Sequence, residues 1–351
     1  MSMEAHELTG ESVWTAALEQ QPERWLYPLS DSLAEEIEDA MQRVRSEGLS
    51  LSELTREDFR LPSWERDLGH FEAALGDGLG FGLIRGLPAD RYTADELEAV
   101  FWLVGIQMGV PMAQNPAGDL IGHVRDHGQS FAMGRVRGYR TKESLTFHSD
   151  YADVVGLLCV QTAKSGGAST LVSSHAVYNE VMRRDIDLGR VLQEQFYFDR
   201  QGEESEGEDP FHQCPIFAWE AGKLSAHYSK RQIENAQVHS KVPEMTERQR
   251  AALELMDEVL TSEGLILHME FERGDIQFLN NYTVLHSRTA FEDHEETERK
   301  RHLLRLWLTM DQRWPLDTSF TNAARFANLE WERATPRGLS DELLEELKVL
   351  A

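Results

Sequence analysis

The segment SLTFHSDYADVVGLLCV, residues 144–160, places a His-x-Asp motif between two stretches that favour β-structure. Before the motif, small or polar residues alternate with apolar ones, and residues 154–160 form the apolar, β-branched run typical of a buried strand. On an extended backbone His148 and Asp150 project to the same face, whereas on a helix they would point about 200° apart. The segment therefore predicts a strand that presents an imidazole and a carboxylate to one metal ion.

A His-x-carboxylate tripeptide is weak evidence by itself, because the chain has 13 His and 61 Asp plus Glu residues. For any single tripeptide of this kind, a surface or core role is the more common interpretation. The stretch 292–298 is acidic and lacks apolar alternation, so its histidine favours a solvated loop. The competing tripeptides begin at His70, His268 and His294.

A third metal ligand is expected at His286. Residues 274–285 open with a Gly-Asp turn, continue as a short strand, break at an Asn pair and lead through a β-rich approach to this histidine. Two imidazoles and one carboxylate form the facial triad that holds non-haem Fe(II) and leaves coordination positions open. His148, Asp150 and His286 are therefore the candidate catalytic and metal-binding residues.

Residues 301–308, RHLLRLWL, predict a strand that carries two arginines on one face. Arg301, Leu303, Arg305 and Trp307 would share that face, and the intervening residues the other. An arginine on a largely apolar strand is costly to bury unless it meets an anion, and its planar fork suits a carboxylate. An edge strand with solvated arginines is the alternative, which the apolar neighbours disfavour.

Residues 165–172, SGGASTLV, place two hydroxyl side chains directly after a Gly pair. Such a pair can be an ordinary hairpin entry. Beside a metal triad it has a second interpretation, in which Ser169 or its neighbour Thr170 hydrogen-bonds the carboxylate that an arginine grips.

Together these segments resemble the taurine dioxygenase (TauD/TfdA) family over most of residues 80–312, beginning at GFGLIRGLP, residues 80–88. The resemblance implies a mainly β fold with flanking helices around a double-stranded β-helix (jelly-roll, cupin-like) core. It also implies Fe(II) as cofactor, with 2-oxoglutarate and O₂ as co-substrates. His148, Asp150 and His286 match the metal ligands. Arg301 matches the arginine that pairs with the distal carboxylate of 2-oxoglutarate, and Ser169 matches the co-substrate hydroxyl, with Thr170 the adjacent alternative.

For the substrate, Arg305 matches an arginine that in several family members binds an anionic group. Tyr151 and Asp153 follow the His-x-Asp motif directly, and Asp153 is either a partner for an amine or a turn residue. Relatives that halogenate replace the triad carboxylate, so Asp150 favours oxidation, most often hydroxylation. The resemblance thus implies oxidation of a small anionic or zwitterionic, carboxylate- or amino-acid-like substrate, with release of succinate and CO₂. The alternative is a cupin-type metal-binding protein or non-oxygenase metalloenzyme, which would not need Arg301.

Bulk properties agree with a small-molecule enzyme. The net charge of −26 over 351 residues argues against nucleic acid or an anionic membrane surface as a partner. No apolar run approaches about 18 residues, and the N-terminus lacks a basic-then-apolar signal. The two cysteines, Cys159 and Cys214, make no disulfide framework. We therefore expect a cytoplasmic location and no nucleic-acid or membrane partner, and the composition is compatible with a homo-oligomer.

The chain is expected to divide into a helical N-terminal extension, residues 1–76, packed on a single catalytic domain, residues 77–351. Ser30 or Asp31 can cap a helix over residues 33–45, Thr93 can open one over 94–108, and Thr246 one over 247–262. Residues 201–209 are too acidic to pack and predict an exposed loop.

Overall fold

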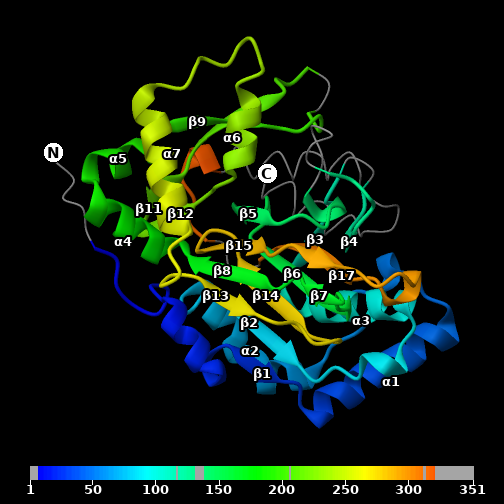
Figure 1. The fold of residues 1–351 in the computed structure, drawn as a ribbon. Helices are drawn as coiled ribbons and strands as arrows, with labels where there is room; N and C mark the ends of the chain where they lie inside the picture. Colours follow the sequence, from blue (N-terminus) through cyan, green and yellow to red (C-terminus); the bar gives the residue numbers. More distant parts are fainter. Residues whose placement is uncertain (1–6, 116–117, 131–137, 205–206, 311–313, 321–351) are drawn as a thin grey trace.

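Two facing β-sheets form the centre of the computed structural model, which describes residues 7–115, 118–130, 138–204, 207–310 and 314–320 (Figure 1). The larger, here the major sheet, has the order β1-β2-β14-β6-β17-β3, and β4 also pairs with β17. The smaller, here the minor sheet, has the order β13-β8-β15-β5. The major-sheet strands are β1 Leu26–Pro28, β2 Phe81–Arg85, β3 Val110–Met112, β4 Ile121–Val124, β6 Val154–Gln161, β14 Ile276–Asn280 and β17 His302–Thr309. The minor-sheet strands are β5 Leu145–His148, β8 Ser169–Ser173, β13 Leu267–Met269 and β15 Val284–Arg288.

Helices cover the outer faces of both sheets (Figure 1). One group, α1 Asp31–Glu47, α2 Pro62–Gly76 and α3 Ala94–Met108, lies against the major sheet. The other lies beside the minor sheet with the hairpins β9 Gln195–Asp199 with β10 Phe211–Pro215 and β11 Phe217–Glu220 with β12 Lys223–Ala226. That group comprises α4 Ser174–Arg184, α5 Ile186–Val191, α6 Lys230–Ala236 and α7 Glu247–Leu260. A short ladder joins β7 Ser165–Gly166 to β16 Phe291–Glu292.

Alternation along the strands separates three buried apolar layers. On β15, Val284 belongs to the layer between the sheets, and the next residue, Leu285, to the layer outside the minor sheet. On β17, Leu306 packs with α1, α2 and α3, whereas Trp307 faces the space between the sheets. Because successive side chains of a strand point to opposite faces, both sheets are buried on two sides. The predicted jelly-roll fold class with flanking helices is confirmed.

The predicted helix starts agree with the caps in the structure. Ser30 accepts the Leu33 N–H at 3.2 Å in front of α1, and Thr93 and Glu96 form a capping box at the start of α3. Thr246 and Gln249 do the same for α7, which ends at Leu260, two residues before the predicted end. Described residues of the acidic segment 201–209 form turns and bends, as expected for an exposed loop.

The opposite face of β17 explains how its strand is held. Leu304, Leu306 and Leu308 are fully buried in the layer shared with α3. Gly105 of α3 permits this close approach, because a Cβ there would lie 2.6 Å from Cδ1 of Leu306. Within the described residues, we find no helix that combines the length and apolar character needed to cross a bilayer.

Candidate active site

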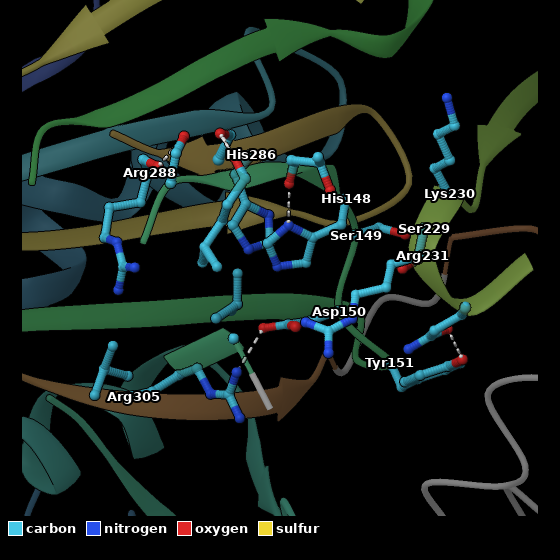
Figure 2. Close-up of a pocket in the computed structure, with 18 of the residues that line it drawn as sticks. His148, Ser149, Asp150, Tyr151, Ser229, Lys230, Arg231, His286, Arg288 and Arg305 are labelled. Carbon is cyan, nitrogen blue, oxygen red and sulfur yellow. Dashed lines mark hydrogen bonds and ion pairs between the residues drawn. The ribbon is translucent and has the colours of Figure 1, made fainter. Parts of the chain in front are cut away.

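A cavity of about 640 Å³ lies between the two sheets (Figure 2). Its wall combines residues from β5, β15 and β17 with the first residues of α6. The side chains predicted to bind metal and co-substrate come from segments more than 130 residues apart, and the sheet pairings bring them to this one space.

The three predicted metal ligands converge on the cavity. His148 ends β5 and is the direct cross-strand partner of His286 on β15, so both rings lie on the same face, with centroids 4.3 Å apart. Asp150 follows two residues later. The potential ligand atoms of these three residues all lie within 4.8 Å of one another, and no other such group occurs in the described parts of the chain. Of the competing histidines, His268 is exposed and pairs with Glu19.

The surroundings of the two imidazole rings favour a ring nitrogen with a free lone pair on each. Nδ1 of His148 lies 2.9 Å from the carbonyl oxygen of Thr146; if Nδ1 carries the proton, Nε2 is left as the ligand atom. Nδ1 of His286 is buried without a hydrogen-bond partner in the described part of the chain. A buried nitrogen of this kind is uncommon unless a ligand completes it. Burial, and then the charge of His148, lower the pKa of His286 to about 3, so its ring is neutral at pH 7.

Asp150 is held from three directions. Its backbone N–H donates to Oδ1 of Asn281, the indole N–H of Trp307 donates to Oδ2 at 2.9 Å, and Nη1 of Arg305 lies 3.4 Å from the same oxygen. Burial alone would raise the pKa of Asp150, but Arg305, the two histidines and the indole N–H outweigh burial and lower the pKa to about 2. The carboxylate is therefore charged and fixed in orientation, as a metal ligand must be.

Arg301 lies at the other end of the cavity wall, immediately before β17. It is 4% exposed, and its Nη2 donates to the carbonyl oxygen of Gly167 at 3.3 Å. Its Nη1 is buried with no hydrogen-bond partner among the described residues. Gly167 has φ +76°, and a Cβ there would lie 2.9 Å from Nε of Arg301, so this glycine makes room for the guanidinium. An unsatisfied buried guanidinium nitrogen is the feature expected of an anion-binding site.

Strand alternation separates the two candidate hydroxyls. Ser169 lines the cavity and shares its face of β8 with Leu171, which lies in the layer between the sheets. Thr170 is buried but does not line the cavity, and Val172 on its face belongs to the layer outside the minor sheet. Of the two hydroxyls, only that of Ser169 therefore faces the cavity.

The three predicted substrate residues have different surroundings. Arg305 lines the cavity, where Nε donates to Oε1 of Gln114 at 2.7 Å and Nη1 pairs with Asp150. Tyr151 also lines the cavity, and its hydroxyl donates to Oε1 of Gln232 on α6 at 2.5 Å (Figure 2). Asp153 is not part of the cavity wall: its carboxylate accepts from Tyr282 Oη at 2.7 Å and from the backbone N–H of Met310 at 2.9 Å. These contacts fit the turn residue that was the alternative for Asp153.

Two residues that line or support the cavity, Arg288 and Asn281, are not indicated by the sequence motifs described above. Arg288 lies two residues after His286 on β15, and strand periodicity alone places it on the same face. Asn281 holds the Asp150 turn, because its Nδ2 donates to the carbonyl oxygen of Ala152 at 2.9 Å while its Oδ1 accepts from Asp150. No local pattern could have indicated that role, since the contact spans 131 residues.

The jelly-roll sheets, the two-histidine, one-carboxylate cluster and the unsatisfied arginine together define a non-haem iron oxygenase that takes an anionic co-substrate. The profile of the family described as "Taurine catabolism dioxygenase TauD, TfdA family" matches residues 47–307, and the chain belongs to this family. It is therefore a 2-oxoglutarate-dependent non-haem iron dioxygenase, which uses Fe(II), 2-oxoglutarate and O₂. Family membership excludes the cupin-type alternative without 2-oxoglutarate.

Two curated relatives and two solved structures illustrate the similarity. FR-33289 synthase of Streptomyces rubellomurinus is 32% identical over 317 residues, covering 90% of this chain and 94% of the relative. The taurine hydroxylase-like protein SAT17 of Stachybotrys chartarum is 29% identical, covering 86% and 80%. An asparagine oxygenase with Fe(II), 3-hydroxyasparagine and succinate has a TM-score of 0.64 at 18% identity, covering 81% of this chain and 93% of that chain. The oxygenase OrfP with Fe and alpha-ketoglutaric acid has a TM-score of 0.60 at 19% identity, covering 82% and 94%.

Proposed function

We propose that this enzyme hydroxylates a small substrate that carries an anionic group. The charge of the cavity wall carries this proposal. Among the described residues that line it, four arginines outnumber two carboxylates, although the chain as a whole has a net charge of −26. Such a local excess of positive charge raises the concentration of anions at the site. The cations are Arg231, Arg288, Arg301 and Arg305, and the carboxylates are Asp150 and Glu234; Lys230 also lines the cavity, but its ammonium pairs with Asp257.

In this proposal His148, Asp150 and His286 hold Fe(II). The hydrogen bond at Nδ1 of His148 and the contacts of Asp150 with Trp307 and Arg305 support the assignment, because partners of this kind orient ligands and raise metal affinity. When bound, iron and 2-oxoglutarate supply the oxidising power: O₂ is consumed, succinate and CO₂ are released, and a C–H bond of the substrate becomes C–OH.

Arg301 and Ser169 are the proposed partners of the distal carboxylate of 2-oxoglutarate. Both line the cavity, and the contact between Arg301 and Gly167 brings the guanidinium to the segment that leads into Ser169. The buried Nη1 of Arg301 needs an acceptor, and a carboxylate supplies one in the planar geometry that guanidinium prefers. We propose no role for Thr170 in binding 2-oxoglutarate.

For the substrate we propose the region between Asp150 and α6. Arg305 reaches it from β17, and Figure 2 shows Arg231 projecting into the cavity from α6. Tyr151 lines the same region and is fixed by its hydrogen bond to Gln232. One structural neighbour, the asparagine oxygenase, was solved with 3-hydroxyasparagine, and another structure of OrfP contains (3S)-hydroxy-L-Arg; both support a substrate with a carboxylate. Since Asp153 is turned toward Tyr282 and Met310, we assign an amine of a zwitterionic substrate to Glu234 instead.

The test begins with anaerobic addition of Fe(II) and 2-oxoglutarate, which should produce the weak visible absorption band of an iron–keto-acid chelate. A screen of succinate release over small carboxylates, amino acids and sulfonates follows. We expect anionic compounds to stimulate release and Arg231→Gln to weaken the stimulation, while Arg190→Gln on the exposed surface of α5 leaves it unchanged. Stimulation by neutral or cationic compounds alone would contradict the proposed substrate class.

We further propose a cytoplasmic enzyme, compatible with a homo-oligomer, with no nucleic-acid or membrane partner; the strongly negative net charge supports this. We also propose that residues 1–76 are an extension of a single catalytic domain, residues 77–351. The burial of α1 and α2 in the same apolar layer as α3 and the major sheet supports this division. Size-exclusion chromatography with light scattering tests the oligomeric state.

A further inference from the structure

Arg288 is a buried cation that the assignments above leave without a role. It is 4% exposed, lies on the same face of β15 as His286, and projects toward the cavity (Figure 2). Its Nη2 donates to the carbonyl oxygens of Thr141, at 2.9 Å, and Glu143. Neither Nε nor Nη1 has a hydrogen-bond partner among the residues that the structure describes. The loop contacts therefore use only one of the three guanidinium nitrogens.

The neighbours of Arg288 are the residues assigned to the co-substrate. In the β15–β8 ladder Arg288 pairs directly with Ser169, so the two side chains lie on the same face of the minor sheet. Arg301 also lies close by. The guanidinium carbon of Arg288 lies 4.8 Å from the ring centre of Phe291, and that of Arg301 lies 5.2 Å from the same point. The two guanidinium carbons are therefore at most the sum of these distances apart, about 10 Å.

The carboxylates near the two arginines do not satisfy the remaining guanidinium nitrogens. The charges of Asp126 and Asp293 favour the charged form of Arg288, and Asp293 also favours that of Arg301. Oδ1 of Asp293, however, accepts the backbone N–H of Arg301 at 2.7 Å, and Nε and Nη1 of Arg288 and Nη1 of Arg301 have no hydrogen-bond partner among the described residues. A buried guanidinium nitrogen without an acceptor is costly, so one further carboxylate would complete this group.

We propose that Arg288 is a second arginine for the distal carboxylate of 2-oxoglutarate, and that with Arg301 it selects keto acids that carry this second carboxylate. A carboxylate has about four lone-pair positions, enough for the unsatisfied nitrogens of both arginines and the hydroxyl of Ser169. The inference extends the assignment of Arg301 and Ser169. The rival interpretation is that Arg288 only anchors residues 141–143 through Nη2.

The test measures binding rather than turnover. The enzyme is loaded with Ni(II), which supports no oxidation here, and titrated by calorimetry with 2-oxoglutarate and with 2-oxopentanoate, in which a methyl group replaces the distal carboxylate. The Kd of 2-oxopentanoate divided by the Kd of 2-oxoglutarate reports the contribution of that carboxylate. We expect Arg288→Gln to weaken 2-oxoglutarate on the order of 10- to 100-fold and to leave 2-oxopentanoate unchanged. Arg288→Lys, which keeps the charge without the fork, should give an intermediate ratio.

Three outcomes would overturn the proposal: equal weakening of both ligands, as a loop anchor predicts; no change in either ligand; or a wild-type enzyme that does not distinguish the two keto acids. Arg301→Gln is the matched comparison. If it leaves the ratio unchanged while Arg288→Gln lowers it, the role of Arg301 is wrong and that of Arg288 stands. If Arg288→Gln does not fold, as judged by circular dichroism, the ratio for Arg288→Lys decides: a wild-type ratio contradicts the proposal, and a reduced ratio with 2-oxopentanoate unchanged supports it.

Discussion

Arg301, directly before β17, and Arg305, within that strand, both face the cavity, but their guanidinium groups differ in their hydrogen-bond partners. Arg305 finds partners inside the protein, Asp150 and Gln114, and its charge helps to keep Asp150, a proposed metal ligand, ionised. Arg301, four residues earlier, retains a buried nitrogen without a partner in the described structure. Arg305 therefore has partners within the protein, whereas Arg301 keeps a hydrogen-bonding position that we propose 2-oxoglutarate fills.

This difference shows how one strand can serve structure and binding together. On its outer face Leu304, Leu306 and Leu308 pack in the layer shared with α3, and pairing with β6, β3 and β4 also holds the strand in place. The inner face can then hold a guanidinium group with an unsatisfied N–H. The packing of the rest of the fold offsets the unfavourable free energy of burying that N–H. Substitutions of Asp150, Arg301 and Arg305 test these two arginine environments separately.

The largest effect is expected for Asp150→Ala. The substitution removes a metal ligand and also leaves Arg305 without its carboxylate partner. We expect Fe(II) affinity to fall on the order of 100-fold or more, with no measurable turnover. Metal content after desalting and calorimetric titration with Fe(II) under anaerobic conditions measure this. Retention of both iron and turnover would show that the metal centre lies elsewhere, and the histidines at positions 70, 268 and 294 would then need testing.

Arg301→Gln tests the guanidinium whose Nη1 has no hydrogen-bond partner in the described structure. Leaving the co-substrate carboxylate buried without this partner should cost about 2–5 kcal/mol, which is more than tenfold in affinity for 2-oxoglutarate. The Michaelis constant of the primary substrate should change far less. Steady-state kinetics in both reactants measure the two values. Equal losses for co-substrate and substrate would contradict the division of labour between Arg301 and Arg305.

Arg305→Lys tests the other arginine and should have a smaller effect. Lysine keeps the positive charge beside Asp150 but loses the planar fork that also reaches Gln114. We expect substrate affinity to fall about tenfold and 2-oxoglutarate affinity to stay near wild type. Succinate release without oxidised product should rise, because the substrate is misplaced. A large loss of thermal stability with unchanged substrate affinity would instead assign Arg305 a purely structural role.

The smallest effect concerns the outer face, where His302 stacks on His123 with ring centroids 5.2 Å apart. Burial, and then the charge of His123, lower the pKa of His302 to about 4. The unfolded chain takes up this proton near pH 6.5, so the stabilising contribution is complete above about pH 6.5 and is lost as the pH falls toward 4. Denaturant titrations should show that His302→Asn loses less stability than wild type over that range.

The difference should be below about 1 kcal/mol, because His302 is only partly buried. His70→Asn, at an exposed position of α2, is the control and should follow the wild-type pH dependence. A variant at position 302 that loses as much stability as wild type between pH 6.5 and 4 would show that His302 does not contribute.

Local patterns predicted individual strands and helix starts, whereas the resemblance to the TauD/TfdA family implied the fold class. The period of two along residues 301–308 correctly separated the cavity face of β17 from its packed face. The same rule places Arg288 on the same face of β15 as His286. The caps at Ser30, Thr93 and Thr246 involve hydrogen bonds within three residues, which is why the sequence indicated them.

The partners of each charged group could not be predicted, because they are distant in the chain. Arg305 meets Asp150 across 155 residues, and Asp153 meets Met310 across 157. The choice between Ser169 and Thr170 depended on which face of β8 turns inward, and that is decided by the register with β15. Only the assembled sheets contain this information.

The position of β17 also has a consequence for synthesis of the protein. This strand lies between β6 and β3 in the major sheet, yet it is the last strand of the described chain. While the ribosome is still translating, β6 has β14 as its only major-sheet neighbour once residue 280 has emerged, and its other edge stays unpaired until residues 302–309 follow. His286 emerges shortly before that strand. Arg305 and Trp307 of β17 hold the carboxylate of Asp150. A chain truncated before residue 302 therefore lacks the contacts that orient this proposed metal ligand, even though it already contains His148, Asp150 and His286.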